Sequence, residues 1–138
     1  MKRVAVALLT IAALAGPASA RDTAGLVIQS GETWIFQVQQ GQPVNAHKAG
    51  ADAKPAAGEF LVTLSLQNGT MMQVVNNTDK FYNYRAFMLK RPDDKGQRTS
   101  VCTLMSNGRM GFENWPYAIP AIRLSDFIEA GENSMQCQ

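Results

Sequence analysis

The segment from Phe60 to Leu89 constrains the fold of this chain more than any other. It contains three runs rich in β-branched, aromatic and other apolar residues, which are typical of β-strands. The turn sequences Asn68-Gly69 and Asn76-Asn77-Thr78-Asp79 separate the runs. Turn residues of this kind between short apolar runs indicate antiparallel connections. The segment therefore predicts a three-stranded antiparallel meander.

The register of the first hairpin follows from which residues can be buried. A two-residue Asn-Gly turn places Leu64 opposite Gln73, whereas a three-residue loop over residues 67–69 places Leu64 opposite Met72. A slip of one residue moves every side chain to the other face, and a buried glutamine needs hydrogen-bond partners. We therefore expect the three-residue loop, with Gly69 at positive φ.

The third run alternates an uncharged set of side chains with a set that contains Arg85. Successive side chains of a strand point to opposite faces of the sheet, so each set occupies one face. The uncharged set should face the core, because a buried charge needs a partner. This set is Tyr82, Tyr84, Ala86 and Met88.

The rest of the chain carries further short strand patterns with turn signals about every eight to twelve residues. This spacing predicts an all-β fold, an immunoglobulin-like antiparallel β-sandwich, with a small β-barrel as the alternative. At residues 121–130 the alternation favours a strand over a helix. The further strands are expected at 33–39, 44–47, 98–105, 110–113 and 121–130, with a strand or docked arm at 26–28, turns at 41–43 and 107–108, and loops at 49–58 and 114–120.

Residues 1–20 have the three parts of a signal peptide. Lys2 and Arg3 precede an apolar run over residues 4–15, and Ala18-Ser19-Ala20 forms a small-residue cleavage site. The apolar run is shorter than the roughly 20 residues that a membrane-spanning helix needs. We therefore expect a signal peptide over 1–20 and a single exported β-sandwich domain over 21–138, periplasmic or secreted, with no membrane span after cleavage.

The predicted mature chain is electrically neutral. The whole sequence carries a formal net charge of +2, and the leader contains two cations and no acidic residue. Proteins that bind nucleic acid or anionic lipid by electrostatics have strongly basic surfaces. We therefore expect no nucleic-acid partner.

The two cysteines, Cys102 and Cys137, both lie in the predicted mature part. An even number of cysteines in an exported protein indicates a disulfide, and no C-x-x-C redox motif occurs in the sequence. We therefore predict a Cys102–Cys137 bond. The chain-entropy model assigns such a loop roughly 3–4 kcal/mol of stabilisation.

The sequence predicts no metal site and no cofactor. The sole histidine, His47, supplies too few ligands for zinc. Methionine thioethers bind Cu(I), so a copper-handling protein using Met71 or Met72 with His47 is an alternative. No Met-x-Met or His-x-Met cluster supports it, and alternating methionines are typical of core packing.

The sequence also predicts no catalytic residues. It contains no G-x-S-x-G motif and no glycine-rich phosphate loop. A small carboxylate-dependent hydrolase using Asp126 with Glu113 is a second alternative. Pairing of Asp126 with Arg123 or Arg85 is the simpler interpretation, because buried charges are usually paired.

The remaining candidate for function is a recognition surface. Trp115, Tyr117 and Arg85 belong to the residue types that dominate binding hot spots, although the two aromatic residues also suit the end of a sandwich core. We therefore expect a non-catalytic binding, scaffolding or accessory module with a protein partner in the cell envelope. The sequence makes no prediction of its oligomeric state.

Overall fold

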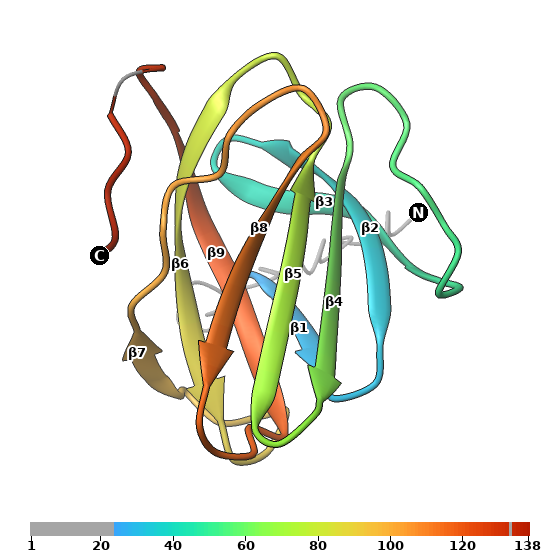
Figure 1. The fold of residues 1–138 in the computed structure, drawn as a ribbon, viewed down its shortest axis with the longest axis vertical. Coiled ribbons are helices and arrows are strands. Elements are labelled where there is room, and N and C mark those ends of the chain that lie inside the picture. The colour runs from blue at the N-terminus through green and yellow to red at the C-terminus, as the bar shows by residue number, and fades with distance from the viewer. Residues whose placement is uncertain (1–23, 133) are drawn as a thin grey trace, which may run out of the picture.

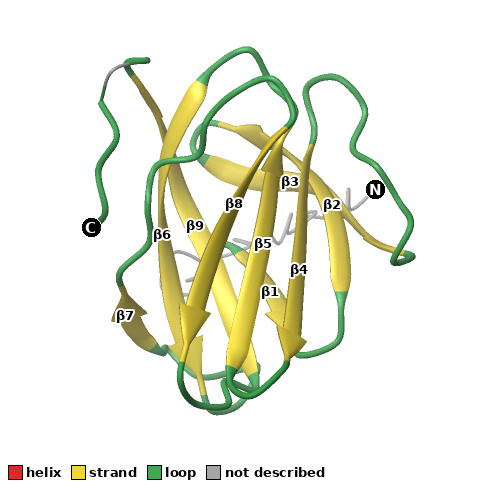
Figure 2. Ribbon diagram, viewed as in Figure 1, coloured by secondary structure: helices red, strands yellow, loops and turns green. Residues whose placement is uncertain are grey.

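The computed structural model describes residues 24–132 and 134–138, so the predicted signal peptide lies outside the described residues. Two antiparallel sheets pack face to face as a β-sandwich, and the described residues form no helix (Figure 1, Figure 2). No apolar helix long enough to cross a membrane is therefore present in this part of the chain. The strands are β1 (Leu26–Gln29), β2 (Thr33–Gln39), β3 (Gln42–Ala49), β4 (Phe60–Leu66), β5 (Thr70–Asn76), β6 (Phe81–Leu89), β7 (Gln97–Thr99), β8 (Arg109–Trp115) and β9 (Ala121–Ala130).

The smaller sheet has the strand order β1-β9-β6-β7, and the larger sheet has the order β3-β2-β4-β5-β8. The two sheets are not closed into a barrel, so the sandwich prediction is confirmed and the barrel alternative is wrong. The predicted strand at 121–130 is also confirmed, since β9 spans these ten residues.

Aromatic rings from both sheets meet at the centre of the core. Phe36 and Phe60 of the larger sheet stack with their centroids 5.2 Å apart, and Tyr84 and Phe127 of the smaller sheet stack at 5.4 Å. Phe127 also meets Phe60 edge-on at 5.4 Å, which joins the two sheets. The predicted inward set of β6 is confirmed, because Tyr84 and Ala86 are buried in the core and Tyr82 and Met88 pack against it.

The predicted register of the first hairpin is confirmed, but the three-stranded meander is wrong. Leu64 lies opposite Met72 across a three-residue loop. β6, however, belongs to the other sheet, so the turn after β5 is a corner between sheets. The buried Asn76 side chain shapes this corner, since its Oδ1 accepts from the N–H and hydroxyl of Thr78 and its Nδ2 donates to the Lys80 carbonyl. Turn residues mark a reversal of the chain without specifying which sheet receives the next strand.

The turn at Asn107-Gly108 also connects the two sheets. The predicted strand at 98–105 is wrong for most of its length, since only β7 and single β-bridges at Cys102 and Leu104 form there. Leu104 forms its bridge with Tyr82 of the smaller sheet. β8 pairs with β5 of the larger sheet. The Asn-Gly sequence therefore does not join two paired strands, because segment 101–104 covers the open side of the sandwich.

β3 is longer than predicted. The reversal before it uses Gln40 and Gly41, both at positive φ, so Gln42 and Pro43 already belong to the strand. Proline is tolerated there because β3 is an edge strand, in which one side needs no ladder hydrogen bonds. The predicted loop at 49–58 corresponds to the connection between β3 and β4.

The structure places the Cys102 and Cys137 sulfur atoms 1.95 Å apart, at disulfide-bonding distance. The C-terminal segment pairs antiparallel with the segment before β8, since Val101 and Gln138 exchange both backbone hydrogen bonds at 2.9 Å. Thr103 and Gln136 add a further backbone bond at 2.8 Å. The cysteine pair thus joins the end of the chain to the segment that covers the open side of the sandwich.

Candidate functional site

The residues of the predicted binding surface lie in three different surroundings. Trp115 ends β8 on its inner face, where the indole is buried and its Nε1 donates to Thr99 Oγ1 at 2.9 Å. Tyr117 lies in the following loop and is 49% exposed. Arg85 lies on the outer face of β6, with its guanidinium 3.6 Å from the Asp126 carboxylate. The structure does not bring the three side chains together.

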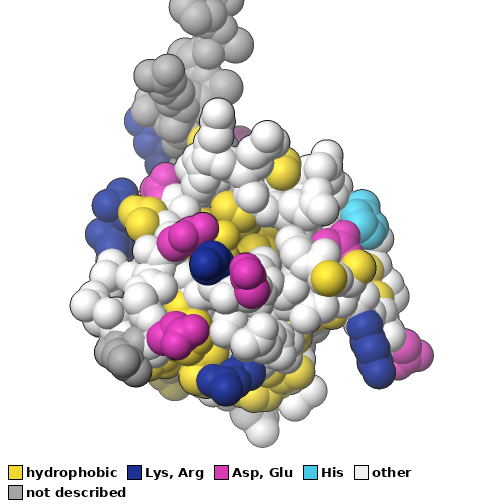
Figure 3. All heavy atoms as spheres, turned by 90° about the horizontal axis from the view of Figure 1, so that it is seen from above, with side chains coloured by type: hydrophobic (Ala, Val, Ile, Leu, Met, Phe, Trp, Pro, Cys, Tyr) yellow, Lys and Arg dark blue, Asp and Glu magenta, His cyan; other side chains and the backbone are white. Residues whose placement is uncertain are grey.

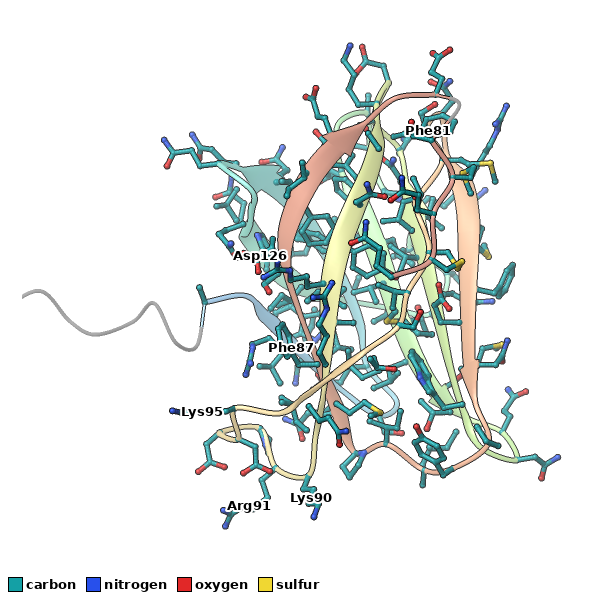
Figure 4. The ribbon with its side chains drawn as sticks, turned by 90° about the vertical axis from the view of Figure 1, so that its left-hand side faces the viewer. Phe81, Phe87, Lys90, Arg91, Lys95 and Asp126 are labelled. Carbon is teal, nitrogen blue, oxygen red and sulfur yellow. A yellow bond between two sulfur atoms is a disulfide. The ribbon has the colours of Figure 1, made fainter. Side chains whose placement is uncertain are left out.

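Asp126 occupies a bulge on the outward side of the four-stranded sheet (Figure 4). Its φ is 54°, and the register between β6 and β9 shifts opposite it. One carboxylate oxygen accepts from Gln42 Nε2 at 2.9 Å, and the other faces Arg85. The pairing of Asp126 with Arg85, the simpler interpretation of the sequence, is therefore confirmed.

Glu113 lies in the other sheet and has a different environment. It points inward from β8, and its Oε1 accepts a hydrogen bond from the Cys102 N–H at 2.7 Å. Burial raises the pKa of Glu113, and this hydrogen bond partly offsets the rise. Burial also raises the pKa of the Tyr84 phenol, and the charge of Glu113 adds to that rise. The structure thus separates Glu113 from Asp126 and gives each carboxylate its own partners.

The residues of the copper alternative are also dispersed. Met72 is fully buried in the core, whereas the adjacent Met71 points to the opposite face of β5. His47 is exposed on the edge strand β3, which β2 and β4 separate from β5 in the sheet. Among the described residues, no three histidine, cysteine, aspartate or glutamate side chains converge in a way that could hold a metal ion.

An apolar row crosses the outer face of the five-stranded sheet. The register pairs Ile35 with Leu61, Leu61 with Val75, and Val75 with Met110. Four neighbouring strands, β2, β4, β5 and β8, therefore contribute one residue each. The outer face of an antiparallel sheet is commonly solvated and polar. Ile35 and Leu61 are buried, so half-buried Val75 and exposed Met110 are the part of this row that is a candidate contact surface.

The loop between β3 and β4 forms one wall of a groove over this row. Asn77 holds the loop in place, because its Nδ2 donates to the Pro55 carbonyl at 3.0 Å and its own carbonyl accepts from the Gly58 N–H at 2.8 Å. Residues 51–55 line one side of the groove. Leu61, Val75 and Met110 belong to its lining on the sheet. The cavity volume is about 600 Å³, within the usual range for binding pockets.

Met110 and Phe112 carry the apolar surface to the edge strand of the sheet. Their side chains are 44% and 53% exposed. Both point outward, because the alternate residues Gly111, Glu113 and Trp115 face the core side of β8. Alternation over residues 110–113 is visible in the sequence but does not identify the outward set. Trp115 is the signal that could have identified the outward set. A large aromatic residue favours the core, and Trp115 shares its face of the strand with Glu113 rather than with Phe112.

Charged side chains do not form an extended patch of one sign around the upper end of the molecule. Viewed from above, basic and acidic side chains are interspersed there (Figure 3). Long-range steering of a charged partner requires a large field of one sign. The described residues at this end therefore offer no such field.

Comparisons with known proteins add no information about function. The chain matches no protein-family model, no curated protein and no solved structure in these comparisons. Its function is therefore inferred from the residues and their geometry.

Proposed function

We propose that this chain is an exported, non-catalytic binding module that contacts a protein partner in the cell envelope through the outer face of the five-stranded sheet. The contact surface consists of the groove between residues 51–55 and β5, together with Met110 and Phe112. The exposure of these two large apolar side chains beside a groove is the observation that carries the proposal.

The energetic argument concerns the removal of these side chains from water. Burial of apolar surface contributes roughly 25 cal/mol per Å², so covering one exposed methionine and one phenylalanine stabilises a complex by a few kcal/mol. Aromatic residues and methionine are enriched at protein interfaces. The groove beside them offers space for one or more apolar side chains of the partner.

Export is the second part of the proposal. It rests on the three-part pattern of residues 1–20 and on the Cys102–Cys137 pair at bonding distance, since such bonds persist in oxidising compartments. We further propose that the mature sandwich is of the immunoglobulin-like type. Cell fractionation followed by intact-mass measurement should find a chain that starts at Arg21 outside the cytoplasm. A full-length cytoplasmic chain would contradict export.

The partner contact is tested by changing the surface at matched positions. Phe112→Asp and Met110→Asp each place a negative charge in the proposed interface. Ile128→Asp is the control, because it places the same charge outside the interface, on the outer side of β9, where Ile128 is 64% exposed. A partner is captured with the wild-type protein, identified by mass and purified, and its affinity is then measured for each variant. We expect losses of about tenfold or more for the first two variants, equivalent to about 1.4 kcal/mol, and no change for the third.

Folding and specificity are controlled in the same experiment. All three variants should keep an unfolding midpoint close to that of the wild type, because the substituted side chains lie at the surface and outside the core. Equal affinity of the wild type and the Phe112→Asp and Met110→Asp variants would overturn the proposed surface. Loss of affinity only in Ile128→Asp would move the contact to the four-stranded sheet.

A further inference from the structure

A second cavity lies where the β6–β7 hairpin meets the loop between β8 and β9. Its volume is about 400 Å³. Apolar residues from both segments line it, among them Met88, Leu89 and Ile119, and Tyr117 stands beside them with its hydroxyl 3.5 Å from the Met88 sulfur. This cavity shares no lining residue with the groove on the five-stranded sheet. It is therefore a separate candidate site.

Buried polar side chains hold both walls of the cavity. On the hairpin side, the Arg123 guanidinium donates to the backbone carbonyls of Asp94 and Lys95. On the loop side, the Thr70 hydroxyl donates to the Tyr117 carbonyl and accepts from the Ile119 N–H, both at 2.8 Å. Binding to walls that are already ordered avoids part of the entropy cost of ordering a flexible site.

The hairpin brings an excess of positive charge to this end of the molecule. Residues 90–98 contain four basic residues, Lys90, Arg91, Lys95 and Arg98, but only two acidic residues, Asp93 and Asp94. Arg91 is paired with the two aspartates at 3.9 and 3.6 Å, whereas Lys90 and Lys95 form no ion pair with any described residue. Lys90 and Arg91 project from the end of the molecule, and Lys95 projects from the side of the hairpin (Figure 4). Lys90 and Lys95 also belong to the lining of the cavity, together with Asp94, whose carboxylate is paired with Arg91.

We infer that this cavity binds a small amphipathic anion, an aliphatic or aromatic carboxylate whose apolar part enters between Met88, Ile119 and Tyr117. The anionic group meets the Lys90 ammonium at the mouth. A mostly apolar lining with a few polar groups at the rim is the usual arrangement of small-molecule sites. The unpaired Lys90 ammonium favours a negatively charged ligand, and the apolar lining favours a ligand that also has an apolar part.

Three probes with chains of ten carbon atoms and different head groups separate these two contributions. Decanoate, decanol and decyltrimethylammonium are titrated into the mature protein by calorimetry, and the Met88 methyl resonance is followed by NMR. We expect saturable binding of decanoate with a shift of that resonance, weaker binding of decanol and weakest binding of the cation. Equal affinity for all three probes, or no decanoate binding below millimolar concentration, would overturn the inference.

Matched variants then locate the contact. Lys90→Glu should weaken decanoate binding by about fivefold or more, whereas Lys80→Glu, which changes an exposed lysine in the turn between β5 and β6, should leave it within about twofold. Ala118→Trp introduces a large side chain at an exposed residue of the cavity lining and should abolish binding while the unfolding midpoint is kept. Unchanged affinity in both Lys90→Glu and Ala118→Trp would place the ligand elsewhere and overturn the site.

Discussion

The guanidinium of Arg123 donates a hydrogen bond to the backbone carbonyl of Asp94 at 3.0 Å and so holds the β6–β7 hairpin against the outer side of β9. It also donates to the Lys95 carbonyl, and its centre lies 4.9 Å from the centroid of the Phe87 ring. Arg123 is only 5% exposed. Two carbonyl oxygens and an aromatic face thus compensate a buried cation, and this arrangement orders the turn that forms one wall of the second cavity.

Replacement of Arg123 by methionine should destabilise the protein and loosen this turn. Met keeps part of the apolar stem but leaves two carbonyls without their donor, and hydrogen bonds to charged groups contribute about 1.5–3 kcal/mol. We expect a loss of about 2–4 kcal/mol in the free energy of unfolding, measured in urea, and faster tryptic cleavage after Lys90 or Lys95. Arg98→Met, at an exposed position of β7, is the control and should change neither quantity. Equal stability of the two variants would contradict the role given to Arg123.

The bond between Cys102 and Cys137 should contribute about 3–4 kcal/mol, because it closes a loop over a sequence separation of 35 residues in the unfolded chain. Cys102→Ser combined with Cys137→Ser removes it without leaving a free thiol. Urea unfolding of this variant should show the loss, and the wild type in strong reductant should reproduce it. A wild-type protein whose unfolding curve is the same with and without reductant would show that the bridge does not stabilise the fold.

Glu32 should make stability depend on pH. Desolvation raises its pKa, but hydrogen bonds from Trp34 Nε1, the Gln29 N–H and Lys48, together with the charge of Lys48, outweigh it and leave the pKa below the ordinary 4.5. The geometry agrees, since these three donors lie 2.9 Å from the carboxylate oxygens. A lowered pKa means that the unfolded chain binds the proton more tightly. The stabilisation is therefore full above the ordinary pKa and is lost as the pH falls through it and through the folded pKa.

The measurement compares the unfolding free energies of the wild type and Glu32→Gln between neutral and acidic pH. We expect the variant to be less stable at neutral pH and the difference to shrink as the pH falls below the ordinary glutamate pKa. Glu132→Gln, at an exposed position near the C-terminus, should follow the wild type throughout. A difference that grows on acidification would reverse the sign and refute the assignment.

Thr70 should be sensitive to loss of its hydroxyl. Thr70→Val keeps the shape of the side chain but leaves the Ile119 N–H and the Tyr117 carbonyl without their partner at a site where Thr70 is 2% exposed. An unsatisfied buried polar group costs about 1–3 kcal/mol, so we expect a loss of that size in urea unfolding. Thr70→Ser keeps the hydroxyl and should retain native Tyr117 and Ile119 chemical shifts, whereas Thr70→Val should change them. Identical spectra for both variants would mean that the hydroxyl does not hold the loop.

Substitution of two glycines at positive φ distinguishes the cost of backbone strain from the cost of steric overlap. At Gly31, with φ 89°, a Cβ atom would lie in open space, whereas at Gly69, with φ 127°, it would overlap the Trp115 carbonyl oxygen. Gly31→Ala should therefore cost about 1–2 kcal/mol from the left-handed backbone alone. Gly69→Ala should cost clearly more in the same unfolding measurement. Equal losses would show that the β4–β5 turn relaxes away from Trp115.

Local residue patterns determined most of the strands and one register, but not the segment 98–105, of which only β7 and two single bridges form. The side chains that can be buried in β4 and β5 fix the pairing of Leu64 with Met72, and alternation identified β9 as a strand. These features depend on neighbours along the chain, such as a glycine that permits positive φ or a period of two in apolar residues. The pairing of Cys102 with Cys137 was predicted from the even number of cysteines and from the absence of a C-x-x-C motif.

Tertiary packing decided the features on which function depends. The Asn76 corner sends β6 into the other sheet, and the burial of Trp115 turns Met110 and Phe112 outward. Arg123 is buried only because the hairpin folds over it and supplies two carbonyl oxygens. In each case the outcome depends on contacts between residues that are distant in sequence. A turn signal or an alternating pattern fixes the local geometry but leaves open which sheet a strand joins and which of its faces is covered.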